Sequence, residues 1–169
     1  RIITVCLMFV VGTSYALDLE LTQGINAALP IAINSFGGGT QAQDLTDVIE
    51  NDLRLSGQFR LIQAPMQGGQ PGINQWSQAG AESVLSGRIQ QTGYNRYRVN
   101  FELADAAAHG RLLLSKDYQV GSSELRALAH YISDEVYQKL TGERGVFSTR
   151  IAYVLVQRNG DRTKYTIDV

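Results

Sequence analysis

The sequence predicts an α/β (α+β) sandwich with a mixed sheet and helices on one side, followed by a β-hairpin. Two observations carry this prediction. From Leu125 to Leu140 apolar residues recur every three or four positions, as in an amphipathic helix. Ser122 or Ser123 is its expected N-cap, and Gly142 can end it. From Arg150 onward the pattern alternates every second residue, as in a strand. The preceding patterns read strand, strand, helix, strand, helix and three strands, so a helix that closes one domain is joined to a strand that opens another.

The first residues predict a signal peptide. Residues 2–11 form an apolar run that is too short to span a bilayer but has the length of a signal core. Ser14 and Ala16 then supply the small residues of a cleavage site, which predicts a signal peptide at 1–16. The alternative is a buried strand or helix of the fold. The single cysteine, Cys6, would leave with the signal, so the remaining chain would have no disulfide or thiol chemistry.

The next segment alternates leucines with acidic residues before a glycine. This pattern is typical of a half-buried strand at a sheet edge. An edge strand beside a free terminus can detach, so the segment is either a structural first strand or a partner-binding arm. Its residues are Leu17, Asp18, Leu19, Glu20, Leu21, Thr22, Gln23 and Gly24.

A strand, a glycine loop and a helix follow. Residues 29–36 read as a strand with Pro30 at its start, where a missing N–H donor is tolerated. The loop leads into a helix expected at 44–56, with Asp44 as its N-cap and Gly57 at its end. Its buried stripe consists of Leu45, Val48, Ile49 and Leu53.

The glycine loop partly resembles a nucleotide-binding loop. Gly37, Gly39 and Ala42 satisfy the G-x-G-x-x-A pattern of dinucleotide-binding loops. A ribose contact would need an acidic residue near Gln63, at the end of the next strand, and the sequence has none there. A tight or mobile loop is therefore expected, and no bound cofactor.

The middle of the chain predicts an antiparallel meander. A short strand at 59–62 and a loop at 63–74 lead to a brief helix, in which Trp76 is expected to anchor the core. From 84 to 120 three strands follow, and the second alternates most cleanly. Its apolar face carries Tyr97, Val99, Phe101 and Leu103. The other face is expected to be a solvated mixture of charges, carrying Arg88, Arg96, Arg98, Glu102, Asp105 and Asp117.

Composition argues against several functional classes. The net charge is −1, 18% of residues are charged, and no basic cluster of the nucleic-acid kind occurs. His130 and Asp134 lie one helical turn apart and are expected to form an ordinary stabilising pair. Ser133 lies beside them and points elsewhere around the helix, so we predict no catalytic residues. We also predict no metal site, because Asp44 and Asp47 lack a supporting His or Cys.

Residues 140–154, which read Leu-Thr-Gly-Glu-Arg-Gly-Val-Phe-Ser-Thr-Arg-Ile-Ala-Tyr-Val, resemble the TolB family of the Tol-Pal system. The resemblance implies a periplasmic protein without enzymatic activity. It implies an α/β domain at 17–145, with a five-stranded mixed sheet beside two main helices. Residues 146–169 would then be the beginning of a six-bladed β-propeller, in which strands at 146–156 and 163–169 form a hairpin with its turn at Asn159 and Gly160.

The resemblance also implies partners. The arm at 17–24 would bind the C-terminal domain of TolA, and the propeller would bind Pal. Such an adaptor would maintain outer-membrane integrity and envelope constriction during cell division. The alternative is a periplasmic small-molecule-binding or hydrolytic domain, which a deep pocket with converging His130 and acidic residues would favour.

Overall fold

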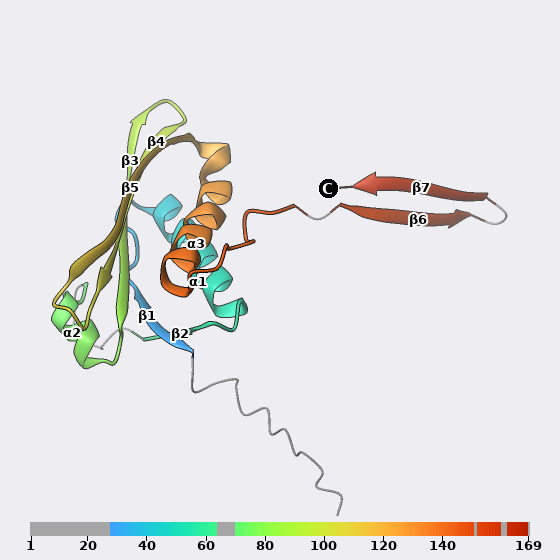
Figure 1. Cartoon of the computed structure of the whole chain (residues 1–169). Coiled ribbons are helices and arrows are strands. Elements are labelled where there is room, and N and C mark those ends of the chain that lie inside the picture. Colours follow the sequence, from blue (N-terminus) through green and yellow to red (C-terminus); the bar gives the residue numbers. More distant parts are fainter. Residues whose placement is uncertain (1–27, 64–69, 151, 160–161, 169) are drawn as a thin grey trace, which may run out of the picture.

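The computed structural model describes residues 28–63, 70–150, 152–159 and 162–168 (Figure 1). The segments at 1–16 and 17–24 therefore lie outside the described residues. A five-stranded sheet consists of β1 (Leu29–Ile33), β2 (Phe59–Leu61), β3 (Ser83–Gly93), β4 (Arg96–Asp105) and β5 (Arg111–Gly121). The helices are α1 (Thr40–Leu55), α2 (Ile73–Gln78) and α3 (Leu125–Thr141), the last preceded by a 3₁₀ turn, η1 (Ser122–Glu124).

The sheet is mixed, as the sequence predicted. Its strand order is β2-β1-β3-β4-β5, in which β1 runs parallel to β2 and β3, and β3, β4 and β5 form an antiparallel meander. The alternation expected for β4 is present: Val99, Phe101 and Leu103 are buried, while the residues between them are exposed. Period-two patterning therefore set which face of the meander packs inward.

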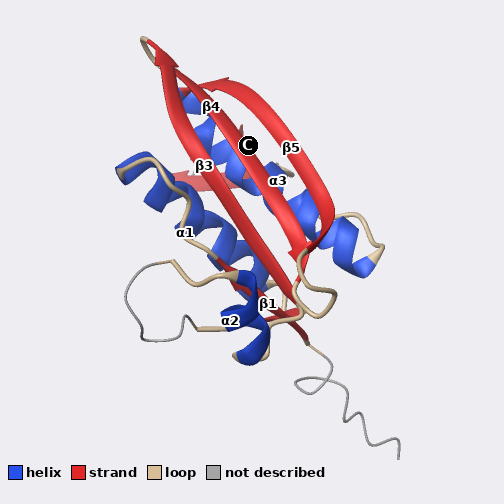
Figure 2. Cartoon of the chain, turned by 90° about the vertical axis from the view of Figure 1, so that its left-hand side faces the viewer, coloured by secondary structure: helices blue, strands red, loops and turns tan. Residues whose placement is uncertain are grey.

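The main core lies between the sheet and the two long helices, α1 and α3, which cover the same face (Figures 1 and 2). Both predicted apolar stripes point into it. Their buried apolar side chains include Leu45, Ile49, Leu53, Leu125, Leu128, Ala129, Ile132 and Val136.

The short helix α2 lies on the opposite face of the sheet, whereas the sequence analysis expected helices on one side only (Figure 1). It covers a second, smaller cluster built on Ala32 of β1 and Val84 of β3. Trp76 anchors that cluster as predicted: it is 2% exposed, and its indole N–H donates to Asn34 Oδ1 at 2.8 Å. A strand sends alternate residues to opposite faces, so a buried Ala32 between Ile31 and Ile33 requires cover on both sides.

Both helix C-termini follow the prediction and both N-termini differ from it. Gly57 and Gly142 have φ of 70° and 79°, the left-handed conformation that glycine adopts after a helix. α1 begins one turn before Asp44, with Gly39 at its N-cap. Ser122 and Ser123 fall inside η1, and the Glu124 carboxylate instead accepts the Gly121 N–H at 2.7 Å.

The C-terminal hairpin consists of β6 (Tyr153–Asn159) and β7 (Arg162–Asp168), paired antiparallel and drawn apart from the sheet and helices in Figure 1. The strand that was expected from residue 146 begins at Tyr153. Residues 146–149 instead form a turn in which the Thr149 N–H donates to the Val146 carbonyl at 3.2 Å.

Candidate functional site

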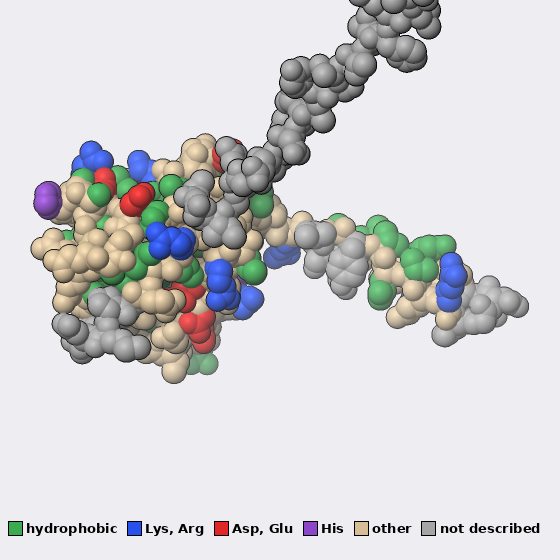
Figure 3. All heavy atoms as spheres, turned by 90° about the horizontal axis from the view of Figure 1, so that it is seen from below, with side chains coloured by type: hydrophobic (Ala, Val, Ile, Leu, Met, Phe, Trp, Pro, Cys, Tyr) green, Lys and Arg blue, Asp and Glu red, His purple; other side chains and the backbone are tan. Residues whose placement is uncertain are grey.

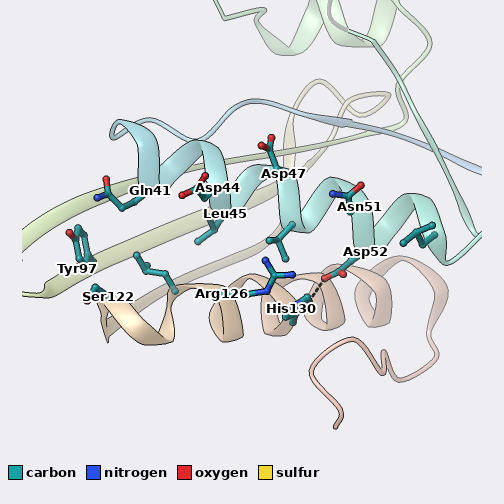
Figure 4. Close-up of a pocket in the computed structure, with 13 residues that line it drawn as sticks. Gln41, Asp44, Leu45, Asp47, Asn51, Asp52, Tyr97, Ser122, Arg126 and His130 are labelled. Atoms are coloured by element: carbon teal, nitrogen blue, oxygen red, sulfur yellow. Dashed lines mark hydrogen bonds and ion pairs between the residues drawn. The ribbon is translucent and has the colours of Figure 1, made fainter. Parts of the chain in front are cut away.

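A groove of about 720 Å³ runs between α1 and α3 (Figure 4). It extends along most of α1, from Gln41 in the first turn to Leu55 at the last residue. Its lining residues are Gln41, Asp44, Leu45, Asp47, Val48, Asn51, Asp52, Leu55, Tyr97, Ser122, Leu125, Arg126 and His130.

The groove is a consequence of how the two helices pack. Leu45 and Leu125 turn toward the sheet and are buried, so they form the floor. The residues flanking the buried stripes point outward and line the walls. Leu55, which is 81% exposed, leaves an apolar side chain at the end of the groove where α1 stops. The groove therefore combines an apolar floor with polar walls.

The two walls differ in charge. α1 contributes Asp44, Asp47 and Asp52, and α3 contributes Arg126 and His130. Among the described residues, a hydrogen-bonded pair joins the two walls: His130 Nδ1 lies 2.8 Å from Asp52 Oδ2, with both side chains mostly buried (Figure 4). The pair joins the last turn of α1 to the second turn of α3.

The expected pairing of His130 with Asp134 is wrong. Asp134 turns away from His130 and accepts the backbone N–H groups of Phe147 at 2.7 Å and Ser148 at 3.0 Å. Helical spacing places the two residues near each other, but each is hydrogen-bonded to a partner from another part of the chain. Asp52 carries no signal in the sequence that would link it to His130, because its approach to His130 depends on how the helices pack.

Among the residues that the structure describes, the groove brings no nucleophile beside His130. Ser133 is buried, and its hydroxyl donates to the Ala129 carbonyl at 3.1 Å. Ser122 lines the groove near Tyr97, away from His130 (Figure 4). The other histidine, His109, is exposed in the β4–β5 turn. Within the described ranges, no group of three or more metal-ligating side chains comes together.

The glycine loop before α1 has a packing role. A Cβ at Gly38, whose φ is 132°, would collide with the Ile89 carbonyl of β3. Gly37 continues the pairing: its N–H donates to the Gly87 carbonyl at 3.1 Å, and its carbonyl accepts the Ile89 N–H at 2.7 Å. Close approach to β3 thus explains why glycine stands at position 38, whereas a Cβ at Gly37 would meet only ordinary contacts.

The solvated face of the meander carries mixed charges, as expected. Arg98 pairs with Asp117 at 3.5 Å, and Arg111 pairs with Asp105 at 2.9 Å. Figure 3, which shows one face of the molecule, likewise has basic and acidic side chains interspersed. In the part of the chain that the structure describes, no helix is long and apolar enough to cross a membrane.

The predicted partner-binding residues lie outside the described residues, but the point where that segment joins the domain is described. The Leu29 N–H donates to the Gln58 carbonyl at 2.9 Å, and Leu29 is paired with Phe59. The segment preceding β1 therefore meets the domain three residues from Leu55, at one end of the groove.

Comparison with known proteins identifies the family. Residues 17–112 match the family model of the TolB amino-terminal domain. The chain is 58% identical over its whole length to the Tol-Pal system protein TolB of Legionella pneumophila strain Philadelphia 1, and 45% identical over 98% of its length to that of Coxiella burnetii. It covers 40% and 41% of those proteins, so it spans about two fifths of the curated relatives it matches.

A solved structure agrees with the sequence comparisons. The crystal structure of TolB from Acinetobacter baumannii superposes with a TM-score of 0.66 at 32% identity, over 86% of this chain and 37% of that one. The matches confirm the resemblance drawn from residues 140–154. Because the family model spans more than half of the chain and the relatives exceed 30% identity over nearly all of it, the chain belongs to the TolB family.

Proposed function

We propose that this chain is the N-terminal part of a non-enzymatic periplasmic adaptor of the Tol-Pal system. The observation that carries the proposal is the 58% identity to a Tol-Pal system protein over the whole chain. The adaptor would bind TolA through its N-terminal arm and Pal through a propeller, and so support outer-membrane integrity and constriction during cell division. The interspersed charges and the lack of a nucleophile beside His130 in the described residues fit a binding role.

The proposed division of the chain has three parts. Residues 1–16 are a signal peptide, removed on export to the periplasm, as their apolar run and small-residue pair suggest. Residues 17–145 are the α/β domain. Residues 146–169 begin a β-propeller, which is supported by the separate hairpin β6–β7 and its exposed apolar side chains.

The arm at residues 17–24 is the proposed TolA-binding element. Its alternation of leucines with Asp18 and Glu20 suits addition of a strand to the partner's sheet, because one face of such a strand is apolar and the other is solvated. In the unbound state the arm docks on its own domain. The groove between α1 and α3 supports this step, because it ends at Leu55, close in sequence to Gln58, whose carbonyl accepts the N–H of Leu29, the first residue of β1.

Calorimetric titration tests the arm. A chain that starts at Leu17 and a chain that starts at Ile25 are each titrated with the C-terminal domain of TolA. We expect heat of binding from the first chain only. Equal binding by both would place the interface elsewhere on the domain, and no binding by either would refute the arm as the TolA-binding element.

A pair of matched substitutions tests whether binding depends on the apolar face of the arm or only on the presence of the arm. Leu19→Asp places a charge on the apolar face of the proposed strand, whereas Glu20→Gln changes the solvated face and leaves the apolar face intact. We expect the first substitution to abolish the heat of binding and the second to leave it close to that of the unchanged chain. Equal losses would argue against pairing through the leucine face.

A second candidate is a small-molecule-binding or hydrolytic domain, and one observation favours it. The pair His130–Asp52 lies on the wall of a groove that also carries Asp44, Asp47 and Arg126. His130→Ala discriminates the two functions: an adaptor that uses the arm keeps TolA binding, whereas a ligand site would lose its ligand. The test is calorimetry with TolA beside a ligand-library thermal-shift screen of both chains.

A further inference from the structure

The segment after α3 is bound to that helix along its length. Residues 145–149, here called the strap, follow the helix-ending Gly142, whose N–H donates to the Gln138 carbonyl at 2.9 Å. Asp134 of α3 accepts three hydrogen bonds from the strap: the Phe147 N–H at 2.7 Å, the Ser148 N–H at 3.0 Å and the Ser148 hydroxyl. One carboxylate thus satisfies two consecutive backbone donors, which is a strong arrangement for an ionised acceptor.

The close approach of the strap to α3 depends on a glycine. Gly145 is buried, and a Cβ built on it would lie 2.6 Å from the Asp134 Cα. That contact is with backbone, which cannot rotate away as the end of a side chain could. Glycine at this position therefore allows the strap to lie directly against the helix.

The strap also contributes to the core. The Phe147 ring packs edge-on against Tyr137 of α3, with centroids 5.7 Å apart, and Tyr137 packs edge-on against Phe59 of β2 at 5.8 Å. Phe147 joins the main hydrophobic cluster as a half-buried member. Hydrogen bonds, close backbone contact and aromatic packing thus all hold the same five residues.

We propose that Asp134 is a latch that fixes the strap to α3, so that the rigid N-terminal unit extends to Thr149 and α3 sets where the chain leaves toward β6. The residues joining the unit to β6 are then those after Thr149, and residues 142–145 do not act as a flexible linker. His130, which contacts α1, lies one turn before Asp134 on the same helix. α3 is therefore held by α1 on one flank and holds the strap on another.

Hydrogen exchange of single amides, measured by NMR on the 169-residue chain, tests the latch. Asp134→Ala removes both acceptors, and we expect exchange at Phe147 and Ser148 to accelerate about tenfold or more, since hydrogen bonds to charged groups are worth at least that factor. Asp134→Asn keeps one carbonyl acceptor and should accelerate exchange by less. Exchange at β4 amides such as Phe101 should not change in either variant.

Glu135→Ala is the matched control. Glu135 is the next residue on α3, but its carboxylate pairs with Lys116 of β5 at 2.8 Å, and among the described residues it makes no hydrogen bond to the strap. We expect normal exchange at Phe147 and Ser148 in this variant. In Gly145→Ala we expect exchange at Phe147 and Ser148 to accelerate. The added methyl group would push the strap off the helix although the Asp134 side chain is unchanged in sequence.

Three results would overturn the proposal. The first is exchange at Phe147 and Ser148 in Asp134→Asn and Asp134→Ala that equals the rate in the unchanged chain. The second is acceleration in Glu135→Ala as large as in Asp134→Ala. The third is acceleration of β4 amides in step with those of the strap, which would mean that Asp134 supports the whole domain instead of latching one segment.

Discussion

Thr46 is the residue whose hydroxyl joins α1 to the chain that leaves β1. It is fully buried, accepts the Phe36 N–H at 3.0 Å and donates to the Ala42 carbonyl at 2.8 Å. Thr46→Val keeps the shape but leaves the Phe36 N–H buried without a partner. We expect the free energy of unfolding to fall by about 1–3 kcal/mol, measured by urea denaturation.

Thr46→Ser serves as the control for that loss. Serine keeps both hydrogen bonds and removes one methyl group, which costs about 1 kcal/mol in a buried site. A Thr46→Val variant at least as stable as Thr46→Ser would show that the Phe36 N–H finds another partner.

Asp105 makes the β4–β5 turn sensitive to acid. Its carboxylate accepts the Ala108 N–H at 2.9 Å and pairs with Arg111 at 2.9 Å. The Ala108 hydrogen bond, followed by Arg111, lowers the pKa of Asp105 below its ordinary value. The stabilisation is therefore full above the unfolded-state pKa, about 3.9, and is lost as the pH falls through the lower folded-state pKa.

Asp105→Asn should remove this part of the acid dependence. We expect the variant to lose less stability than the unchanged chain between about pH 5 and pH 2, measured by thermal melts at each pH. Asp117→Asn, which removes an exposed pair with Arg98 at 3.5 Å, is the comparison. Parallel stability curves for Asp105→Asn and the unchanged chain would contradict the prediction.

The pairing of α1 with α3 includes the contact between His130 and Asp52, which a double-mutant cycle can measure. Both side chains are mostly removed from water, so their hydrogen bond should be worth more than an exposed pair. We expect a coupling free energy of about 1 kcal/mol between His130→Ala and Asp52→Ala, obtained from urea denaturation.

A second cycle gives the reference for that coupling. Asp47 lies on the same helix and accepts a hydrogen bond from Gln43 at 2.8 Å. His130→Ala and Asp47→Ala should therefore be additive within about 0.5 kcal/mol. Equal coupling in both cycles would mean that His130 responds to the charge of α1 in general and not to Asp52.

Sequence predicted the elements of this fold better than their beginnings. Helix ends were predicted because Gly57 and Gly142 supply a backbone conformation that few other residues adopt. Helix starts were not, because Gly39 caps α1 without a side chain and Glu124 caps η1 from three residues downstream. The groove was not predicted for a different reason. Its walls are the polar residues that flank the apolar stripes of α1 and α3. An apolar stripe shows which face of a helix is buried, but not which other helix packs beside it.

At the scale of the whole molecule, patterning predicted a mixed sheet but not the order of its strands. Alternation of apolar and polar residues shows which face of a strand is buried, but not which strands are neighbours. β1 lies between β2 and β3 because two crossovers through helices return the chain to either side of it. The second face carried a clue in Ala32, which is buried between Ile31 and Ile33, and in Trp76, which needed a partner for its N–H. Both residues indicate that α2 covers this face. Their meaning becomes clear only when the arrangement of the sheet is known.

The hairpin β6–β7 carries an apolar face that nothing in the α/β domain is built to cover. Val154 is paired with Ile167, and Val156 with Tyr165, so these four side chains share one face, and all are exposed. A two-stranded hairpin is marginally stable in water, and further strands packed on this face would bury it.

We expect the chain to associate through the apolar face of the hairpin, and Val156→Lys to reduce that association. Thr166→Lys, on the other face, is the control, with association measured by sedimentation velocity across a concentration series. The melting temperature of the α/β domain should be the same in all three chains, and a drop of several degrees in Val156→Lys alone would show instead that the apolar face packs on the domain.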